Sequence, residues 1–225
     1  MRKVLIWAVV LVMAMPVLAY VARIKYLEHR ADKKVMQTIQ SNYWQKMCKS
    51  HRKTNKMDRV TVFIGDSLTE LFDLSVFHDS TIINRGICGD FSYGVLQRVA
   101  EITRHNPSKI FIEIGINDIR EEVPLSKTIS NYESIVNYLR QKLPDAKIFI
   151  QSDLPTSDQC VNDRVLELNR LLIELSRNYK VEYIDLHSHF VREQSINPAL
   201  TTDGVHLNES GYQIWYDVIR KHVLM

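Results

Sequence analysis

The chain has 225 residues, of which 45% are hydrophobic, and a formal net charge of +3. This length suffices for one sizeable domain with an extension. Eleven basic and three acidic residues fall between Arg23 and Arg59, so the rest of the chain from Val60 onward is net acidic, and the charge does not indicate nucleic-acid binding. The cysteines match no zinc motif and no disulfide framework, which leaves one bridge or free thiols as alternatives for Cys48, Cys88 and Cys160.

The amino terminus begins with an uncharged segment. Val4 to Ala22 is nineteen residues long and follows Arg2 and Lys3. At about 1.5 Å per residue, a helix of this length could cross most of a ~30 Å hydrocarbon core. We favour the interpretation that residues 1–22 form an uncleaved signal-anchor. The alternative is a signal peptide with a cleavage site at residues 17–19. We expect an extracytoplasmic domain, periplasmic in a Gram-negative cell, although the basic residues after Ala22 favour the opposite orientation.

Residues 23–58 are expected to form a basic helical stalk and linker. Apolar residues repeat every four positions between residues 24 and 50, which predicts a narrow apolar stripe on a polar helix, formed by Val35, Ile39, Tyr43 and Met47. Two interpretations remain open. The stalk either packs lightly on the domain or contacts anionic lipid.

From Val60 onward, strand and helix patterns alternate. Short runs rich in β-branched and aromatic residues predict five strands, at residues 60–64, 81–84, 109–115, 147–151 and 181–186. Between and after them, the sequence predicts a short helix or turn at 68–77 and helices at 92–105, 124–143, 161–179 and 208–223. This alternation predicts a three-layer α/β/α sandwich around a five-stranded parallel sheet, flavodoxin-like, over residues 59–225.

Two patterns suggest nucleophilic catalysis. The first strand ends abruptly at Gly65-Asp66-Ser67, and a hydroxyl at the carboxyl end of such a strand stands where ligands bind in α/β folds. Asp203 and His206 lie three residues apart before the last helix, a spacing that lets the carboxylate reach Nδ1 while Nε2 faces a serine. Taken singly, each pattern is also compatible with a helix cap or a surface pair.

Four blocks occur in order: Gly-Asp-Ser-Leu at 65–68, Asn-Arg-Gly at 84–86, Gly-Ile-Asn-Asp at 115–118 and Asp-Gly-Val-His-Leu-Asn at 203–208. Together they resemble the SGNH hydrolases, also called GDSL esterases and lipases. The resemblance covers roughly residues 60–223. It is closest to bacterial acylhydrolases similar to sialate O-acetylesterases and platelet-activating-factor acetylhydrolases.

The resemblance implies a role for each of five residues. Ser67 would be the nucleophile, His206 the general base and later acid, and Asp203 the group that orients the imidazole. The backbone N–H groups of Ser67 and Gly86 and the side-chain amide of Asn117 would form the oxyanion hole. Neither a cofactor nor a metal is implied.

The expected activity is serine ester hydrolysis through an acyl-enzyme, on a small acyl group such as O-acetyl on a carbohydrate. A lysophospholipase or lipid acetylhydrolase is the first alternative, and the apolar segment and basic stalk favour it. A non-catalytic binding module on a hydrolase scaffold is the second. The loop 153–160 and the loop around Phe91 and Tyr93 are expected to contact substrate.

Other polar residues receive weaker interpretations. Asp66 and Asp118 are expected to accept hydrogen bonds that shape their loops. Glu113 lies in a buried strand and should have a partner. His187 and His189 have a spacing that can ligate metal, but the sequence offers no third ligand.

Overall fold

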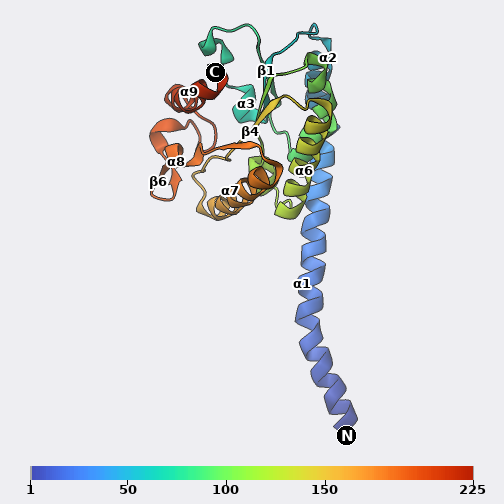
Figure 1. Cartoon of the computed structure of the whole chain (residues 1–225). Coiled ribbons are helices and arrows are strands. Elements are labelled where there is room, and N and C mark those ends of the chain that lie inside the picture. The colour runs from blue at the N-terminus through green and yellow to red at the C-terminus, as the bar shows by residue number, and fades with distance from the viewer. Residues whose placement is uncertain (1, 225) are drawn as a thin grey trace.

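The computed structural model describes the backbone of residues 2–224 and the side chains of residues 15–224. Its centre is a five-stranded, all-parallel sheet in the order β2-β1-β3-β4-β5 (Figure 1). The strands span Thr61–Gly65 (β1), Ile82–Gly86 (β2), Lys109–Glu113 (β3), Lys147–Gln151 (β4) and Glu182–Ile184 (β5). The predicted strands and sheet class are confirmed.

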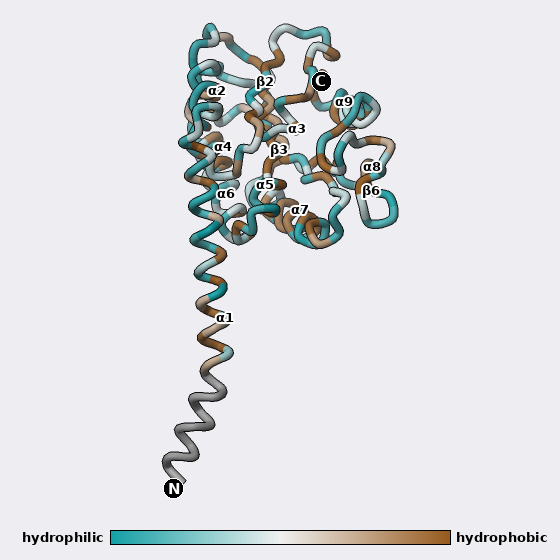
Figure 2. The backbone as a smooth tube through the Cα atoms, turned by 180° about the vertical axis from the view of Figure 1, so that it is seen from behind, coloured by the Kyte–Doolittle hydropathy of each residue, from teal (hydrophilic) through white to brown (hydrophobic). Residues whose placement is uncertain are grey.

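Helices cover both faces of the sheet, as expected for parallel strands. One face carries α4 (Ser92–Ile102), α6 (Leu125–Lys142) and α7 (Gln159–Tyr179), whose apolar residues form one core with Val62, Ile64, Ile110 and Ile112. The other face carries the short helix α3 (Ser67–Glu70), the 3₁₀ turn η1 (Leu74–Phe77) and α9 (Glu209–Leu224). Apolar residues are concentrated on the central strands (Figure 2).

Alternation along each strand separates these two cores, because successive side chains point to opposite faces. Phe63, Phe111 and Phe149 are in register on β1, β3 and β4 and all point to the α9 face. Their rings stack at centroid distances of 4.6 Å and 4.5 Å. Each such pair adds about 0.5–1.5 kcal/mol beyond the area that it buries.

Several short elements complete the chain. Helix α5 (Ile116–Arg120) follows β3, and the 3₁₀ turn η2 (Thr103–His105) follows α4. The segment after β5 contains α8 (His187–Phe190), a small hairpin of β6 (Val191–Arg192) and β7 (Ser195–Ile196), and the turn η3 (Pro198–Leu200). The thiols of Cys48, Cys88 and Cys160 are free.

Two helices precede the sheet, and the second begins within the segment where the apolar repeat predicts a single stalk helix. Helix α1 (Arg2–Ile39) projects from the domain (Figure 1), and α2 (Asn42–Lys53) begins after Ser41, whose side chain accepts a hydrogen bond from the Trp44 N–H. This cap interrupts the predicted helix, because the Ser41 backbone is extended. Side chains from both helices are buried against the domain, among them Ala31, Val35, Trp44 and Cys48.

The predicted apolar segment 4–22 forms part of α1, and its side chains up to residue 14 lie outside those that the structure describes. Among the described residues, no helix combines the length and the apolar character needed to span a bilayer.

Candidate active site

The polar residues singled out in the sequence meet at the carboxyl-terminal edge of the sheet. Ser67 is the first residue of α3, directly after β1, and Asn117 lies in α5, directly after β3. Asp203 and His206 lie in the loop that precedes α9. Parallel strands bring their carboxyl ends to one edge, which is where ligands bind in such folds.

Ser67, His206 and Asp203 form a continuous chain of contacts. The Ser67 Oγ lies 3.1 Å from His206 Nε2, and His206 Nδ1 lies 2.7 Å from Asp203 Oδ2. The other carboxylate oxygen of Asp203 accepts hydrogen bonds from the backbone N–H groups of Val205 (2.9 Å) and His206 (2.8 Å). The predicted spacing therefore produces a turn in which the carboxylate holds both the backbone and the ring of the histidine.

The electrostatics of this pair favour an ionised Asp203. The hydrogen bond with the His206 side chain, together with the backbone donors, lowers the pKa of Asp203 to about 2. Asp203 and His206 are half-exposed at the rim of the site, whereas Ser67 is 8% exposed.

The structure corrects the prediction for Gly86. This residue belongs to β2 rather than to the following loop, and its backbone N–H donates to Asn84 Oδ1 at 2.8 Å. A Cβ at Gly86 would lie 2.2 Å from the backbone N of Glu70, so the glycine is needed for close packing of α3 on β2. With its N–H already bonded and its surface covered, Gly86 does not present a donor to the site.

Gly89 has the features that Gly86 lacks. Its φ is +73°, a left-handed conformation that favours glycine, and a Cβ placed there would meet no atom within 4 Å. The Gly89 N–H has no acceptor among the described residues, and Gly89 is partly exposed. The sequence pattern does not distinguish the two glycines, because both follow the second predicted strand. The positive φ arises from the turn closed by the Asp90 N–H and the Ile87 carbonyl (3.0 Å).

Asn117 points its amide toward the same loop. Its Nδ2 donates to the backbone oxygen of Asp90 at 3.0 Å and, at a longer 3.3 Å, to Asp66 Oδ2. The backbone N–H of Ser67, at the first position of α3, likewise has no acceptor within the described chain. Three N–H donors therefore belong to segments that converge beside the serine: Ser67, Gly89 and Asn117.

Asp66 and Asp118 accept hydrogen bonds, as predicted, and the donors lie in helices α3, α4 and α6. Asp66 Oδ1 accepts from the Leu68 N–H at 2.9 Å, and Asp118 accepts from the N–H and hydroxyl of Ser92 and from the Thr128 hydroxyl. Burial raises the pKa of Asp66 to about 7 and that of Asp118 to about 6.

The prediction that Glu113 has a hydrogen-bond partner is wrong. Glu113 is fully buried, and neither of its carboxyl oxygens has a hydrogen-bond partner in the described chain. Burial, together with the nearby carboxyl groups of Asp66 and Asp153, raises the pKa of Glu113 well above its usual value.

The two histidines of interest after β5 do not join a ligand cluster. Within the described part of the chain, no three His, Cys, Asp or Glu side chains converge in a way that could hold a metal ion. His187 instead lines a cavity of about 760 Å³ with Gln159, Asn162, Asp163 and Gln194. Gln159, the first lining residue in chain order, lies two positions after Ser157. The backbone N–H of Ser157 donates to the Gly204 carbonyl at 2.8 Å.

Comparison with curated proteins gives remote relatives. The N-acylneuraminate cytidylyltransferase of Streptococcus agalactiae serotype V is 20% identical over 166 residues, which make up 71% of this chain and only 39% of that protein. The platelet-activating factor acetylhydrolase IB subunit alpha2 of Rattus norvegicus is 26% identical over 162 residues, 67% of this chain and 70% of the relative. The chain thus spans about two fifths of the first relative.

Solved structures share the fold over most of the chain. One described as a platelet activating factor from Streptococcus pneumonia has a TM-score of 0.70 at 25% identity and covers 92% of this chain and 99% of its own. An acylhydrolase from Bacteroides fragilis has a TM-score of 0.71 at 26% identity, covering 80% and 95%.

A family model for the GDSL-like lipase/acylhydrolase family matches residues 63–214, which contain Ser67, Asn117, Asp203 and His206. The resemblance seen in the four ordered sequence blocks is therefore confirmed. This chain belongs to the GDSL-like lipase/acylhydrolase family, the SGNH hydrolases, and is a hydrolase.

Proposed function

We propose that the protein is a serine esterase that cleaves a carboxylic ester through an acyl-enzyme intermediate. The observation that carries the proposal is the unbroken contact chain from Ser67 Oγ through His206 to Asp203, with distances of 3.1 Å and 2.7 Å. A serine hydroxyl is a weak nucleophile unless a positioned base removes its proton. This arrangement supplies the base and the group that orients it.

The first half of the reaction follows from these contacts. His206 Nε2 takes the Ser67 hydroxyl proton while Oγ attacks the ester carbonyl carbon. The ionised Asp203 stabilises the imidazolium that results. His206 then gives the proton to the departing alcohol oxygen as the tetrahedral intermediate collapses. The alcohol leaves, and the acyl group stays bonded to Ser67.

The second half repeats these steps with water. His206 accepts a proton from water, which attacks the acyl carbon, and returns it to Ser67 Oγ as the acid is released. In both halves the negative charge develops on the former carbonyl oxygen. We assign its donors as the backbone N–H groups of Ser67 and Gly89 and the Asn117 amide. An oxyanion can replace Asp66 at the longer of the two Asn117 contacts.

For the substrate, we propose a small acyl group, such as acetyl, on a carbohydrate alcohol. The acetyl group has support in the name of the acetylhydrolase relative. The carbohydrate has support in the cavity lined by His187, where Gln159, Asp163 and Gln194 lie beside the apolar residues Leu166 and Val191. Amide and carboxylate groups of this kind are suited to hydrogen-bond sugar hydroxyls.

A lipid ester is the second candidate, and a different cavity favours it. About 430 Å³ lies between α1 and α6, lined by the apolar residues Val35, Met36 and Val123 and by Tyr93. Helix α1 also carries exposed apolar side chains, including Leu18 (63% exposed) and Tyr20 (66%). Such a surface is suited to an acyl chain or a lipid aggregate.

The test is a panel of acetylated sugars, p-nitrophenyl acetate and 2-acetyl phospholipid incubated with the full chain, with released acetate and the deacylated alcohol both identified. We expect release from the sugars and from the nitrophenyl ester, and none with Ser67→Ala. Hydrolysis of the phospholipid alone would show that the substrate is a lipid ester. Turnover by folded Ser67→Ala at the wild-type rate would refute the acyl-enzyme.

A further inference from the structure

Helix α2 lies outside the residues that match the family model, yet its side chains reach the loop that contains Gly89. We define the oxyanion loop as residues 87–90. We propose that Trp44 and Tyr43 of α2 are positioning residues that hold this loop in its catalytic conformation. The inference rests on the proposed function, because the loop matters through its donor at Gly89.

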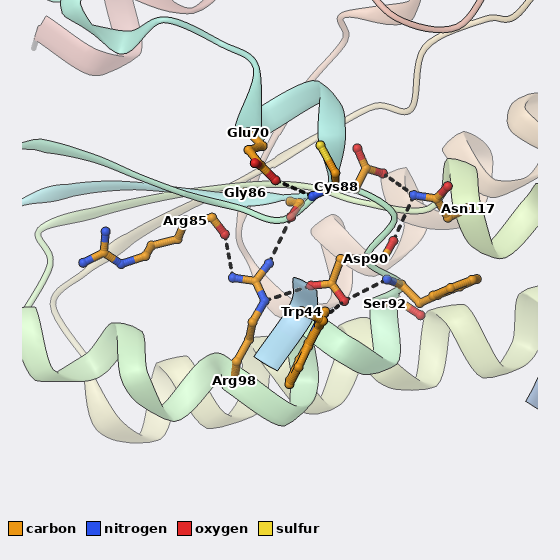
Figure 3. A network of polar contacts seen from close by, with 12 residues as sticks. Trp44, Glu70, Arg85, Gly86, Cys88, Asp90, Ser92, Arg98 and Asn117 are labelled. Atoms are coloured by element: carbon orange, nitrogen blue, oxygen red, sulfur yellow. Dashed lines mark hydrogen bonds and ion pairs between the residues drawn. The ribbon is translucent and has the colours of Figure 1, made fainter. Parts of the chain in front are cut away.

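Trp44 contacts the carboxyl-terminal end of the oxyanion loop (Figure 3). Its indole Nε1–H donates to Asp90 Oδ1 at 2.9 Å, with Trp44 only 5% exposed and Asp90 fully buried. The ring also packs with Cys48 against Ile87. The contact is tight enough to require Gly94, because a Cβ there would lie 1.8 Å from Asp90 Oδ1 and 3.3 Å from Trp44 Nε1.

Asp90 passes this constraint on to the site. Its second carboxyl oxygen, Oδ2, accepts from Arg98 Nε at 2.8 Å, and Arg98 also donates to the backbone oxygen of Arg85 near the end of β2 (Figure 3). A further hydrogen bond runs from Arg98 to the backbone oxygen of Gly65 at the end of β1. The backbone oxygen of Asp90 accepts from Asn117 Nδ2. Burial raises the pKa of Asp90, whereas the donors on Arg98 and Trp44 favour its ionised form. One side chain of α2 therefore supports both the loop and the amide of Asn117.

Tyr43 reaches the amino-terminal end of the same loop. Its hydroxyl donates to Glu70 Oε1, and Glu70 Oε2 accepts the backbone N–H of Cys88. Glu70 is the last residue of α3, the helix that begins with Ser67. The hydrogen bond to Glu70 raises the pKa of the Tyr43 hydroxyl, so this group remains a donor at neutral pH.

Gly89 thus lies between two residues that are each tethered to α2. The Cys88 N–H is held through Glu70 by Tyr43, and the Asp90 carboxylate is held by Trp44. A glycine at positive φ has little intrinsic preference for one conformation, so its N–H direction depends on these flanking contacts. Rates that rely on prearranged donors fall when the donors can move.

The test replaces single donors in the full chain. Trp44→Phe keeps an aromatic ring and removes the Nε1–H. We expect kcat for p-nitrophenyl acetate to fall about ten-fold, less than the hundred-fold or more expected for loss of a direct donor. KM should change less than two-fold. The acid limb of the pH profile of kcat/KM should keep its midpoint, because no contact of the Ser67–His206–Asp203 chain involves α2.

Trp215→Phe is the matched control. Trp215 is fully buried, and its Nε1–H donates to Gln151 Oε1 at 2.8 Å in the core on the α9 face. The bond is of the same kind as that of Trp44 but does not involve the oxyanion loop. Trp215→Phe should lower thermal stability as Trp44→Phe does, while its kcat stays within two-fold of wild type.

Tyr43→Phe provides a second variant whose folding is not in question, because Tyr43 is 44% exposed. Its kcat should also fall, about three-fold, and the two substitutions together should cost more than either alone. Wild-type kcat in both folded variants would overturn the proposal, as would equal losses of kcat in Trp44→Phe and Trp215→Phe. Activity in Ser67→Ala would instead refute the proposed function itself.

Discussion

At the scale of single residues, the site depends on where a few N–H and O–H groups point. The predicted chain of Ser67, His206 and Asp203 is present as contacts within hydrogen-bonding distance. The donor predicted at Gly86 is already bonded to Asn84, whereas the Gly89 N–H has no acceptor within the described part of the chain. The motif located the right loop. The choice between its two glycines depended on β2 continuing to Gly86, which the sequence pattern does not show.

Asn117→Ala should separate transition-state stabilisation from binding. Removing the amide deletes a donor that acts mainly when the carbonyl oxygen becomes charged. We expect kcat for p-nitrophenyl acetate to fall at least about 100-fold, equivalent to about 3 kcal/mol, with KM changed less than about three-fold. Steady-state kinetics with the purified variant measure both.

The matched control for this prediction is Asn137→Ala. Asn137 on α6 is exposed, and among the described residues its side chain makes a single hydrogen bond, a long 3.4 Å contact with the Tyr179 hydroxyl. It should retain wild-type kinetics. A kcat for Asn117→Ala within three-fold of wild type, in a folded variant, would remove Asn117 from the oxyanion hole.

At the scale of elements, the strands were predictable because each is a short apolar run, rich in β-branched residues, that ends at a turn. The same convergence of strand ends produced a feature that the sequence does not reveal. Asp66 follows β1, Glu113 ends β3 and Asp153 follows β4, and all three carboxyl groups are fully buried beneath the site. Linear spacing does not show that they meet.

Glu113→Gln tests this buried group through the pH dependence of stability. The folded-state pKa of Glu113 is raised, by burial first and then by Asp66 and Asp153. The contribution of Glu113 to the free energy of unfolding is therefore fully present below the unfolded pKa of about 4.5, and it is lost as pH rises toward the folded pKa. Glutamine stays neutral throughout. The melting temperature of the variant should therefore rise relative to that of wild type between pH 4.5 and pH 8. Each kcal/mol of difference in the free energy of unfolding corresponds to about 2–4 °C.

Melting temperatures of both proteins across this range provide the measurement. Glu167→Gln is the control, because Glu167 is an exposed residue on α7. A difference between Glu113→Gln and wild type that does not change with pH would show that the buried carboxyl carries no such penalty.

At the scale of the whole molecule, the division into a stalk and a domain underestimates their contact. Residues 23–58 were expected to pack lightly or to face lipid. The two helices of this segment differ in their contact with the domain. Helix α1 projects away from it (Figure 1), whereas α2 packs buried side chains against the oxyanion loop. Helical periodicity identified the apolar stripe but not what it covers. The partners of Val35 and Trp44, at Val123 and Asp90, are separated from them by more than forty positions in the sequence.

Whether Ser67 forms the covalent intermediate can be measured by locating a trapped adduct. The full chain is treated with a fluorophosphonate and digested with trypsin, and the labelled peptide is sequenced by mass spectrometry. We expect one adduct, on Ser67 within residues 60–85, absent from Ser67→Ala and formed far more slowly in His206→Ala. Equal labelling of Ser67→Ala at another residue, or no adduct on a chain that hydrolyses p-nitrophenyl acetate, would contradict this expectation.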